Sequence, residues 1–227
     1  MIHCGHPPAR RIGRITLPWP AKTASPAAPP GTIGSMDLLE AYRRSLAEFI
    51  DRVDQVGPGQ WSDPTPCPDW DVRALVNHVV GEDRWSVPLL AGRTIDEVGG
   101  RFDGDQLGAD PATMAREAAA QAEIAATHPG ALDRTVHLSA GDTPADEYLQ
   151  QLLAEHLVHG WDLAVAIGAE PRLDPDVVRV CARWFADRVD DYRDNDLVRA
   201  GVRVSDDDEQ DLLLAAFGRD PDWVPGG

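Results

Sequence analysis

The chain has 227 residues and a formal net charge of −17; residues 1–35 contribute four bases and no acid, so residues 36–227 carry 17 bases against 38 acids, a net charge of −21. A body this acidic repels nucleic-acid phosphates and gains little on anionic lipid, and no apolar run approaches the roughly 18–20 residues that a membrane span requires. The sequence therefore predicts no nucleic-acid partner and no membrane. Because Lys22 is the only lysine, the folded part also lacks a residue for Schiff-base or P-loop chemistry.

The first 35 residues differ in composition from the rest of the chain. They contain seven prolines and no acid, and helical periodicity begins only after Met36. We expect residues 1–35 to be a disordered or over-annotated extension, and residues 36–227 to form one helical domain. Arg10-Arg11 resembles an export signal, but prolines break the apolar segment that should follow it. Together with three widely separated cysteines, this favours a cytoplasmic protein.

Apolar residues recur at three- and four-residue intervals in several segments, which predicts amphipathic helices and an all-α fold. Asp71 is a good N-cap, Pro111 suits a first helical position, and Gly168 suits a helix end. Between the second and third helices, residues 92–110 are acidic and glycine-rich and predict an irregular connection. The expected helices span residues 37–56, 71–90, 111–128, 144–168 and 174–192, with a short final helix after residue 205 and a short strand at 135–138.

The helix expected at 144–168 is apolar over most of its surface and keeps one narrow polar strip. That strip consists of Gln151, Glu155, His159 and Asp162. Residues four apart on a helix lie one turn above each other, so a carboxylate and an imidazole at this spacing can converge on one ion. Either this strip faces solvent, which spacing alone favours, or it lines an internal polar site.

A metal site needs a further ligand, and His78 is the best candidate. It lies at or beside the apolar face of the helix expected at 71–90, and antiparallel packing of the two helices would bring it towards Glu155 and His159. Two imidazoles and one carboxylate are a ligand set typical of catalytic zinc with an open fourth position. Asp162 would then orient an imidazole through its other N–H. His156 and Glu82 are rival ligands, although His156 falls in the apolar stripe of its helix.

Two motifs carry a resemblance to a known family. They are Trp-Ser-Asp-Pro-Thr-Pro-Cys-Pro-Asp-Trp-Asp-Val-Arg-Ala-Leu-Val-Asn-His at 61–78 and Glu-His-Leu-Val-His-Gly-Trp-Asp-Leu-Ala at 155–164. The chain, from about residue 36 to 223, resembles the actinobacterial metal-binding proteins related to mycothiol-dependent maleylpyruvate isomerase. The resemblance implies a DinB-like four-helix bundle with additional C-terminal helices. It also implies that His78, Glu155 and His159 hold the metal.

In that isomerase a divalent metal, taken to be zinc, works with the thiol mycothiol to convert maleylpyruvate to fumarylpyruvate. An additional C-terminal domain completes the isomerase site, and we expect no such domain in this chain. The resemblance therefore implies a divalent ion, zinc in the first instance, with mycothiol as a candidate thiol cosubstrate.

Three functions remain open from the sequence. The leading hypothesis is a zinc-dependent transferase or isomerase that binds a small thiol or small polar substrate at the open metal position, with no catalytic residue assigned beyond the ligands. The alternative is a non-catalytic or stress-related metal-binding module in which the ion holds the helices together. The third has no ion, and the polar strip faces solvent. Apolar helix faces serve cores and subunit contacts alike, so the oligomeric state, a dimer included, stays open.

Overall fold

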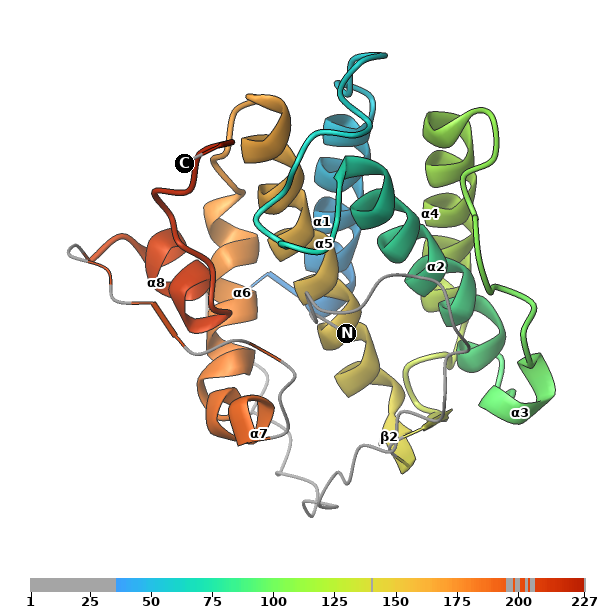
Figure 1. The fold of residues 1–227 in the computed structure, drawn as a ribbon. Coiled ribbons are helices and arrows are strands. Elements are labelled where there is room, and N and C mark those ends of the chain that lie inside the picture. The colour runs from blue at the N-terminus through green and yellow to red at the C-terminus, as the bar shows by residue number, and fades with distance from the viewer. Residues whose placement is uncertain are drawn as a thin grey trace.

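The computed structural model describes residues 36–139, 141–194, 198, 201–202, 204 and 207–226. The extension expected at residues 1–35 lies outside these. The described part is mostly helical, as the sequence predicted (Figure 1). Its elements are α1 (Leu38–Val53), α2 (Val72–Leu90), α3 (Ile95–Val98), α4 (Pro111–Thr127), β1 (Thr135–Leu138), β2 (Gly141–Pro144), α5 (Ala145–Ile167), α6 (Pro175–Ala186), α7 (Val189–Asp194) and α8 (Glu209–Ala216). None of the helices in the described ranges is long and apolar enough to cross a membrane.

The ends of the long helices follow from their capping residues. The Asp71 side chain accepts a hydrogen bond from the Ala74 amide and starts α2, while Pro111 occupies the first turn of α4. Gly168 ends α5 with a φ of 71°, a left-handed conformation that favours glycine. The predicted limits of these three helices are therefore confirmed to within a residue or two.

Helix α5 is the central element of the fold. It packs against α1, α2 and α6, while α4 covers α1 and α2, and α8 packs against α6 (Figure 1). As a result almost every residue from Tyr148 to Ala164 is buried, polar ones included. Such a helix has no solvent-facing side, and this fact decides where the polar strip lies.

Two short elements were not predicted. Strand β2 pairs antiparallel with the expected β1, in a register that sets Thr135 opposite Pro144, and it runs directly into α5. The connection between α2 and α4 contains α3, whose start carries a capping box between Thr94 and Glu97. The hairpin fixes the entry of α5 into the core.

The prediction of a single helix at 174–192 is wrong. The chain forms α6, ends it at Ala186, and starts α7 at Val189. At the break Arg188 donates hydrogen bonds to the Trp184 carbonyl and to the Glu147 carboxylate. The break brings the ring of Tyr192 back onto Trp184 and Phe185, with centroids 5.9 Å and 5.3 Å away. The final helix, α8, begins after its N-cap Asp208.

Candidate metal centre

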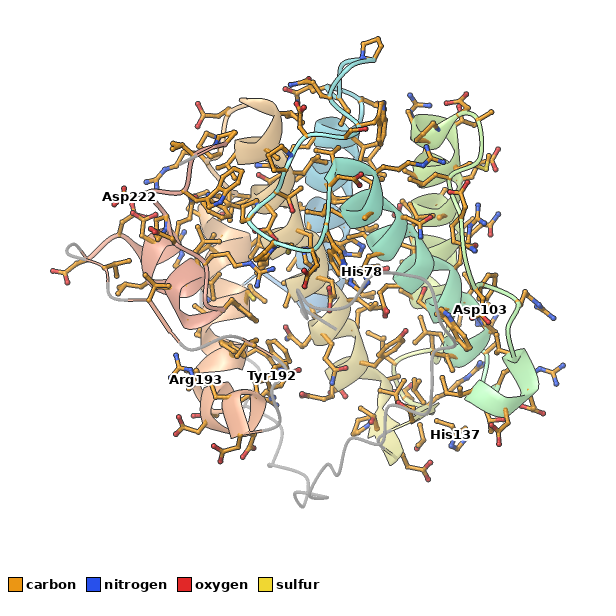
Figure 2. All side chains as sticks on the ribbon, in the orientation of Figure 1. His78, Asp103, His137, Tyr192, Arg193 and Asp222 are labelled. Carbon is orange, nitrogen blue, oxygen red and sulfur yellow. The ribbon has the colours of Figure 1, made fainter. Side chains whose placement is uncertain are left out.

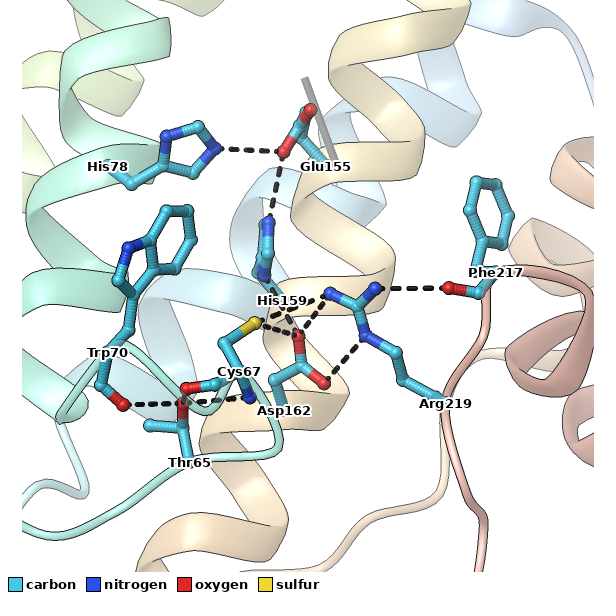
Figure 3. Close-up of polar contacts among 9 residues, drawn as sticks. All are labelled: Thr65, Cys67, Trp70, His78, Glu155, His159, Asp162, Phe217 and Arg219. Atoms are coloured by element: carbon cyan, nitrogen blue, oxygen red, sulfur yellow. Dashed lines mark hydrogen bonds and ion pairs between the residues drawn. The ribbon is translucent and has the colours of Figure 1, made fainter. Parts of the chain in front are cut away.

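His78, Glu155 and His159 meet between α2 and α5 (Figure 3). Oε2 of Glu155 lies 3.1 Å from Nε2 of His78 and 3.1 Å from Nε2 of His159. One potential ligand atom from each residue falls within 4.8 Å of the other two. The structure thus brings together the three side chains that the sequence singled out, from segments 77 residues apart.

Of the two alternatives that the sequence left open for the polar strip of α5, the internal one holds at Glu155, His159 and Asp162, and the solvent-facing one that spacing alone favoured is wrong. Glu155, His159 and Asp162 are at most 1% exposed. His78 differs from them because 19% of its side chain remains accessible. The three-residue cluster is therefore closed on the α5 side and reachable on the α2 side.

Asp162 fixes the orientation of His159. Its Oδ2 lies 2.9 Å from Nδ1 of His159, and a carboxylate only accepts, so Nδ1 carries a proton and the neutral ring presents its lone pair at Nε2. Burial opposes protonation of His159, but its contacts with the Asp162 and Glu155 carboxylates outweigh it and raise its pKa. At His78 burial dominates and lowers the pKa, which favours the neutral imidazole that a metal requires.

Arg219 is a site residue that the sequence did not reveal. It reaches Asp162 from 57 residues further along the chain, with Nε 3.2 Å from Oδ1 and Nη2 2.8 Å from Oδ2 (Figure 3). Its Nη1 donates to the Phe217 carbonyl, and the residue is 3% exposed. Burial alone would raise the pKa of Asp162, yet Arg219 and His159 lower it. Asp162 is therefore held ionised between a guanidinium and an imidazole.

The loop at residues 65–70 builds the wall next to the imidazoles. The Thr65 hydroxyl donates to the Trp70 carbonyl at 2.8 Å and accepts from the Cys67 amide at 3.1 Å, which pins the loop. The Trp70 ring then lies 4.7 Å from the ring of His78 and 5.7 Å from that of His159, centroid to centroid. Through these contacts Thr65, Cys67 and Trp70 together shape the wall beside His78.

The rival ligands do not join the three-residue cluster. His156 turns away from it, and its Nε2 lies 2.9 Å from Oδ1 of Asp83. Glu82 belongs to neither grouping of candidate ligand atoms found among the described residues. The second grouping, Cys67 with His159 and Asp162, is poorly suited to a cation because Arg219 already contacts both carboxylate oxygens of Asp162.

The donor set at His78, Glu155 and His159 fits a divalent ion. Donors bound tetrahedrally at about 2.0–2.1 Å lie about 3.3 Å apart, close to the 3.1 Å contacts found here. Nε2 of His159 is buried and faces Oε2 of Glu155 at 3.1 Å without the geometry of a hydrogen bond, although a buried ring nitrogen ordinarily has a hydrogen-bond partner. A cation between the three groups would give that nitrogen one.

The cluster does not line the open cleft on the other side of α2. That cleft, of about 600 Å³, runs between α2, α3 and α4 and is lined by Arg84, Phe102 and Glu117 among others. None of the three candidate ligands belongs to its walls. Of the three candidate ligands, His78 is the one whose side chain keeps an accessible part.

Comparisons with known proteins agree with the motifs. The family model of the mycothiol maleylpyruvate isomerase N-terminal domain matches residues 42–164. Two relatives, the uncharacterized proteins MT0763 and Rv0738 of Mycobacterium tuberculosis, are each 31% identical over 151 residues, which cover 63% of this chain and 74% of theirs. No solved structure matches the chain. The matched range includes all three candidate ligands.

Proposed function

The chain belongs to the family of the mycothiol maleylpyruvate isomerase N-terminal domain, and on that premise we propose that it binds one divalent metal ion through His78, Glu155 and His159 and uses it to activate a small thiol. Zinc is the proposed ion and mycothiol the proposed thiol. The proposal extends to the fold: α1, α2, α4 and α5, which pack against one another in pairs, correspond to a DinB-like four-helix bundle with added C-terminal helices.

The observation that carries the proposal is that the partly accessible His78 of α2 meets the buried Glu155 and His159 of α5. When zinc is bound by such a set, it supplies a Lewis acid that makes a thiolate available at neutral pH. Two histidines and a glutamate leave a fourth position for that thiol. A small polar substrate would have to approach by the accessible part of His78.

The residues of the chain have distinct parts in this proposal. Glu155 supplies the negative charge that balances the cation, and the 19% accessible His78 side chain marks the path for the incoming thiol. Asp162 holds the His159 ring with Nε2 directed at the site. The Trp70 ring covers both imidazoles and keeps water from that side. Isomerisation and thiol transfer are both compatible with this arrangement.

The second candidate function is a structural metal site that ties α2 to α5. It predicts a closed coordination shell with four protein donors. Within the described residues only three donors converge at this point, and one of them is partly exposed. These observations favour the thiol-binding function over the structural one.

Metal content tests the first half of the proposal. Protein purified without a metal-binding tag is analysed for metals, beside His78→Ala, His159→Ala and the control His137→Ala. His137 of β1 has a 39% exposed side chain, contacts Asp142 at 2.7 Å and lies apart from His78 (Figure 2), so its loss changes histidine content but not the cluster. We expect one metal per chain in the parent and control and none in the other two. Equal metal in all four proteins, or none, would contradict the proposal.

A spectroscopic experiment tests the thiol. Cobalt(II) replaces the native ion, and a small thiol, then mycothiol, is titrated into the protein. Direct coordination produces a sulfur-to-cobalt charge-transfer band in the near ultraviolet, which a closed structural site would not develop. A metal-loaded protein whose spectrum is unchanged by thiol supports the structural function instead.

A further inference from the structure

A second buried polar cluster lies in the core beside the candidate metal centre. We call Tyr42, Asp83, Tyr148 and His156 the core polar cluster. Its side chains come from α1, α2 and α5, and its central contact joins His156 Nε2 to Asp83 Oδ1 at 2.9 Å. Asp83 and His156 are each 1% exposed. This pair takes no part in the proposed metal binding.

The contact between Asp83 and His156 satisfies only half of each side chain. Within the described residues Oδ2 of Asp83, Nδ1 of His156 and the hydroxyls of Tyr42 and Tyr148 are all buried without a hydrogen-bond partner. Native proteins leave few such groups unpaired, because burying a polar group with no partner is costly. Four of them in one cluster indicate an occupant that forms hydrogen bonds.

Contacts with His156 tie Tyr42 and Asp83 together, and the charge on Asp83 acts on both tyrosine hydroxyls. The Tyr42 ring meets the His156 ring edge to face, with centroids 5.5 Å apart. Burial raises the pKa of Tyr42 well above its ordinary value, and the charge on Asp83 raises it further. Burial and the charges on Glu82 and Asp83 do the same for Tyr148. Both hydroxyls therefore stay protonated.

The chemistry of the groups selects the occupant. Asp83 Oδ2 only accepts, a tyrosine hydroxyl both donates and accepts, and Nδ1 of His156 does one or the other according to its tautomer. An anion would be repelled by Asp83, and an apolar molecule would leave every group unpaired. Water donates two hydrogen bonds and accepts two, and buried waters of globular proteins typically make about three bonds to such groups.

We propose that Tyr42, Asp83, Tyr148 and His156 form a second, internally hydrated site, in which trapped water joins α1 and α2 to α5. Asp83 lies five residues after His78 on α2, and His156 follows Glu155 on α5. The hydrated cluster therefore fixes the rotation of α5 relative to α2 on which the contact between His78 and Glu155 depends. This last step, a positioning role for the cluster, rests on the proposed metal binding; the hydration does not.

Tyrosine-to-phenylalanine variants test the hydration, because the two alternatives predict opposite signs. Removing a hydroxyl that is bonded to water loses a hydrogen bond, whereas removing a dry, unpaired hydroxyl relieves a penalty. For Tyr42→Phe and Tyr148→Phe we expect the unfolding equilibrium constant of metal-free protein to rise roughly threefold to tenfold. An unchanged or smaller constant in both variants would overturn the proposal. Urea titration measures it.

Zinc affinity tests the positioning role, with Tyr192→Phe as the matched control. Tyr192 is a buried tyrosine of α7, outside the cluster. Competition with a chromophoric chelator should give weaker zinc binding for Tyr42→Phe and Tyr148→Phe, by several-fold, and unchanged binding for Tyr192→Phe. Equal affinity in all three variants refutes the positioning role. A parent protein that binds no zinc refutes the proposed function, while the unfolding data still decide the hydration.

Discussion

Replacing Asp162 by asparagine should separate two roles of one carboxylate. Asparagine keeps the shape of the side chain but removes the charge that faces both His159 and Arg219. Loss of the group that orients a metal-binding histidine typically weakens metal binding tenfold to a hundredfold, or about 1.4–2.8 kcal/mol. Loss of one partner of a buried ion pair typically lowers the free energy of unfolding by about 3–5 kcal/mol. Asp162→Asn should show both effects.

A double variant distinguishes the two. Adding Arg219→Met to Asp162→Asn removes the buried guanidinium that lost its counter-charge, so much of the stability should return, while zinc affinity should stay low. Urea unfolding of metal-free protein measures the first quantity, and zinc competition with a chelator measures the second. If Asp162→Asn bound zinc as tightly as the parent, or if the second substitution restored zinc affinity, Asp162 would not be the group that orients His159.

Three further outcomes are expected. Protons compete with the metal for His159, so zinc affinity should fall as pH decreases from 8 towards 6. Because the pKa of His159 is raised, the decline should begin above the ordinary histidine pKa of 6.5, and an affinity that stays constant over this range would contradict the prediction. The pKa of Asp162 is lowered in the folded chain, so the stability that its ionised carboxylate contributes is complete above its ordinary pKa of 3.8 and disappears as pH falls through the lower folded value. Acid titration of the free energy of unfolding should show this pH-dependent part in the parent and not in Asp162→Asn. Gly160→Ala should raise the free energy of unfolding by about 0.5–1 kcal/mol, because glycine weakens a helix interior and an added Cβ meets nothing closer than Arg52 at 3.6 Å. Urea titration measures this change, and a destabilised variant would show that the space is too small.

Local chemistry made much of the fold predictable. An aspartate N-cap, a proline in a first turn and a left-handed glycine act within a few residues, and they placed the limits of α2, α4 and α5 correctly. The break between α6 and α7 has no such local cause. It depends on Arg188 reaching Glu147, 41 residues earlier, and the apolar periodicity continues across it. A pattern read along one segment cannot reveal that contact.

The candidate site was likewise predictable where local spacing determines it and not where distant contacts do. Helical spacing and the family motifs selected His78, Glu155 and His159, and the structure brings them together. Spacing also favoured a solvent-facing strip, which is wrong because α1, α2 and α6 all pack on α5. Arg219 was missed because it lies in a short segment after α8 without periodicity, and only the folded chain sets it against Asp162. The one indication in the sequence was Asp162 itself, because an aspartate within an apolar helix needs a positively charged side chain from elsewhere in the chain.

The ion pair between Asp162 and Arg219 has a consequence for biosynthesis. A ribosome delivers Asp162 57 residues before Arg219, so α5 emerges before the guanidinium that pairs with its carboxylate in the folded core. Docking of α5 between its neighbours is then penalised until the later segment has left the exit tunnel. Nascent chains stalled before that point should remain open to proteases and chaperones, whereas chains released after it can close.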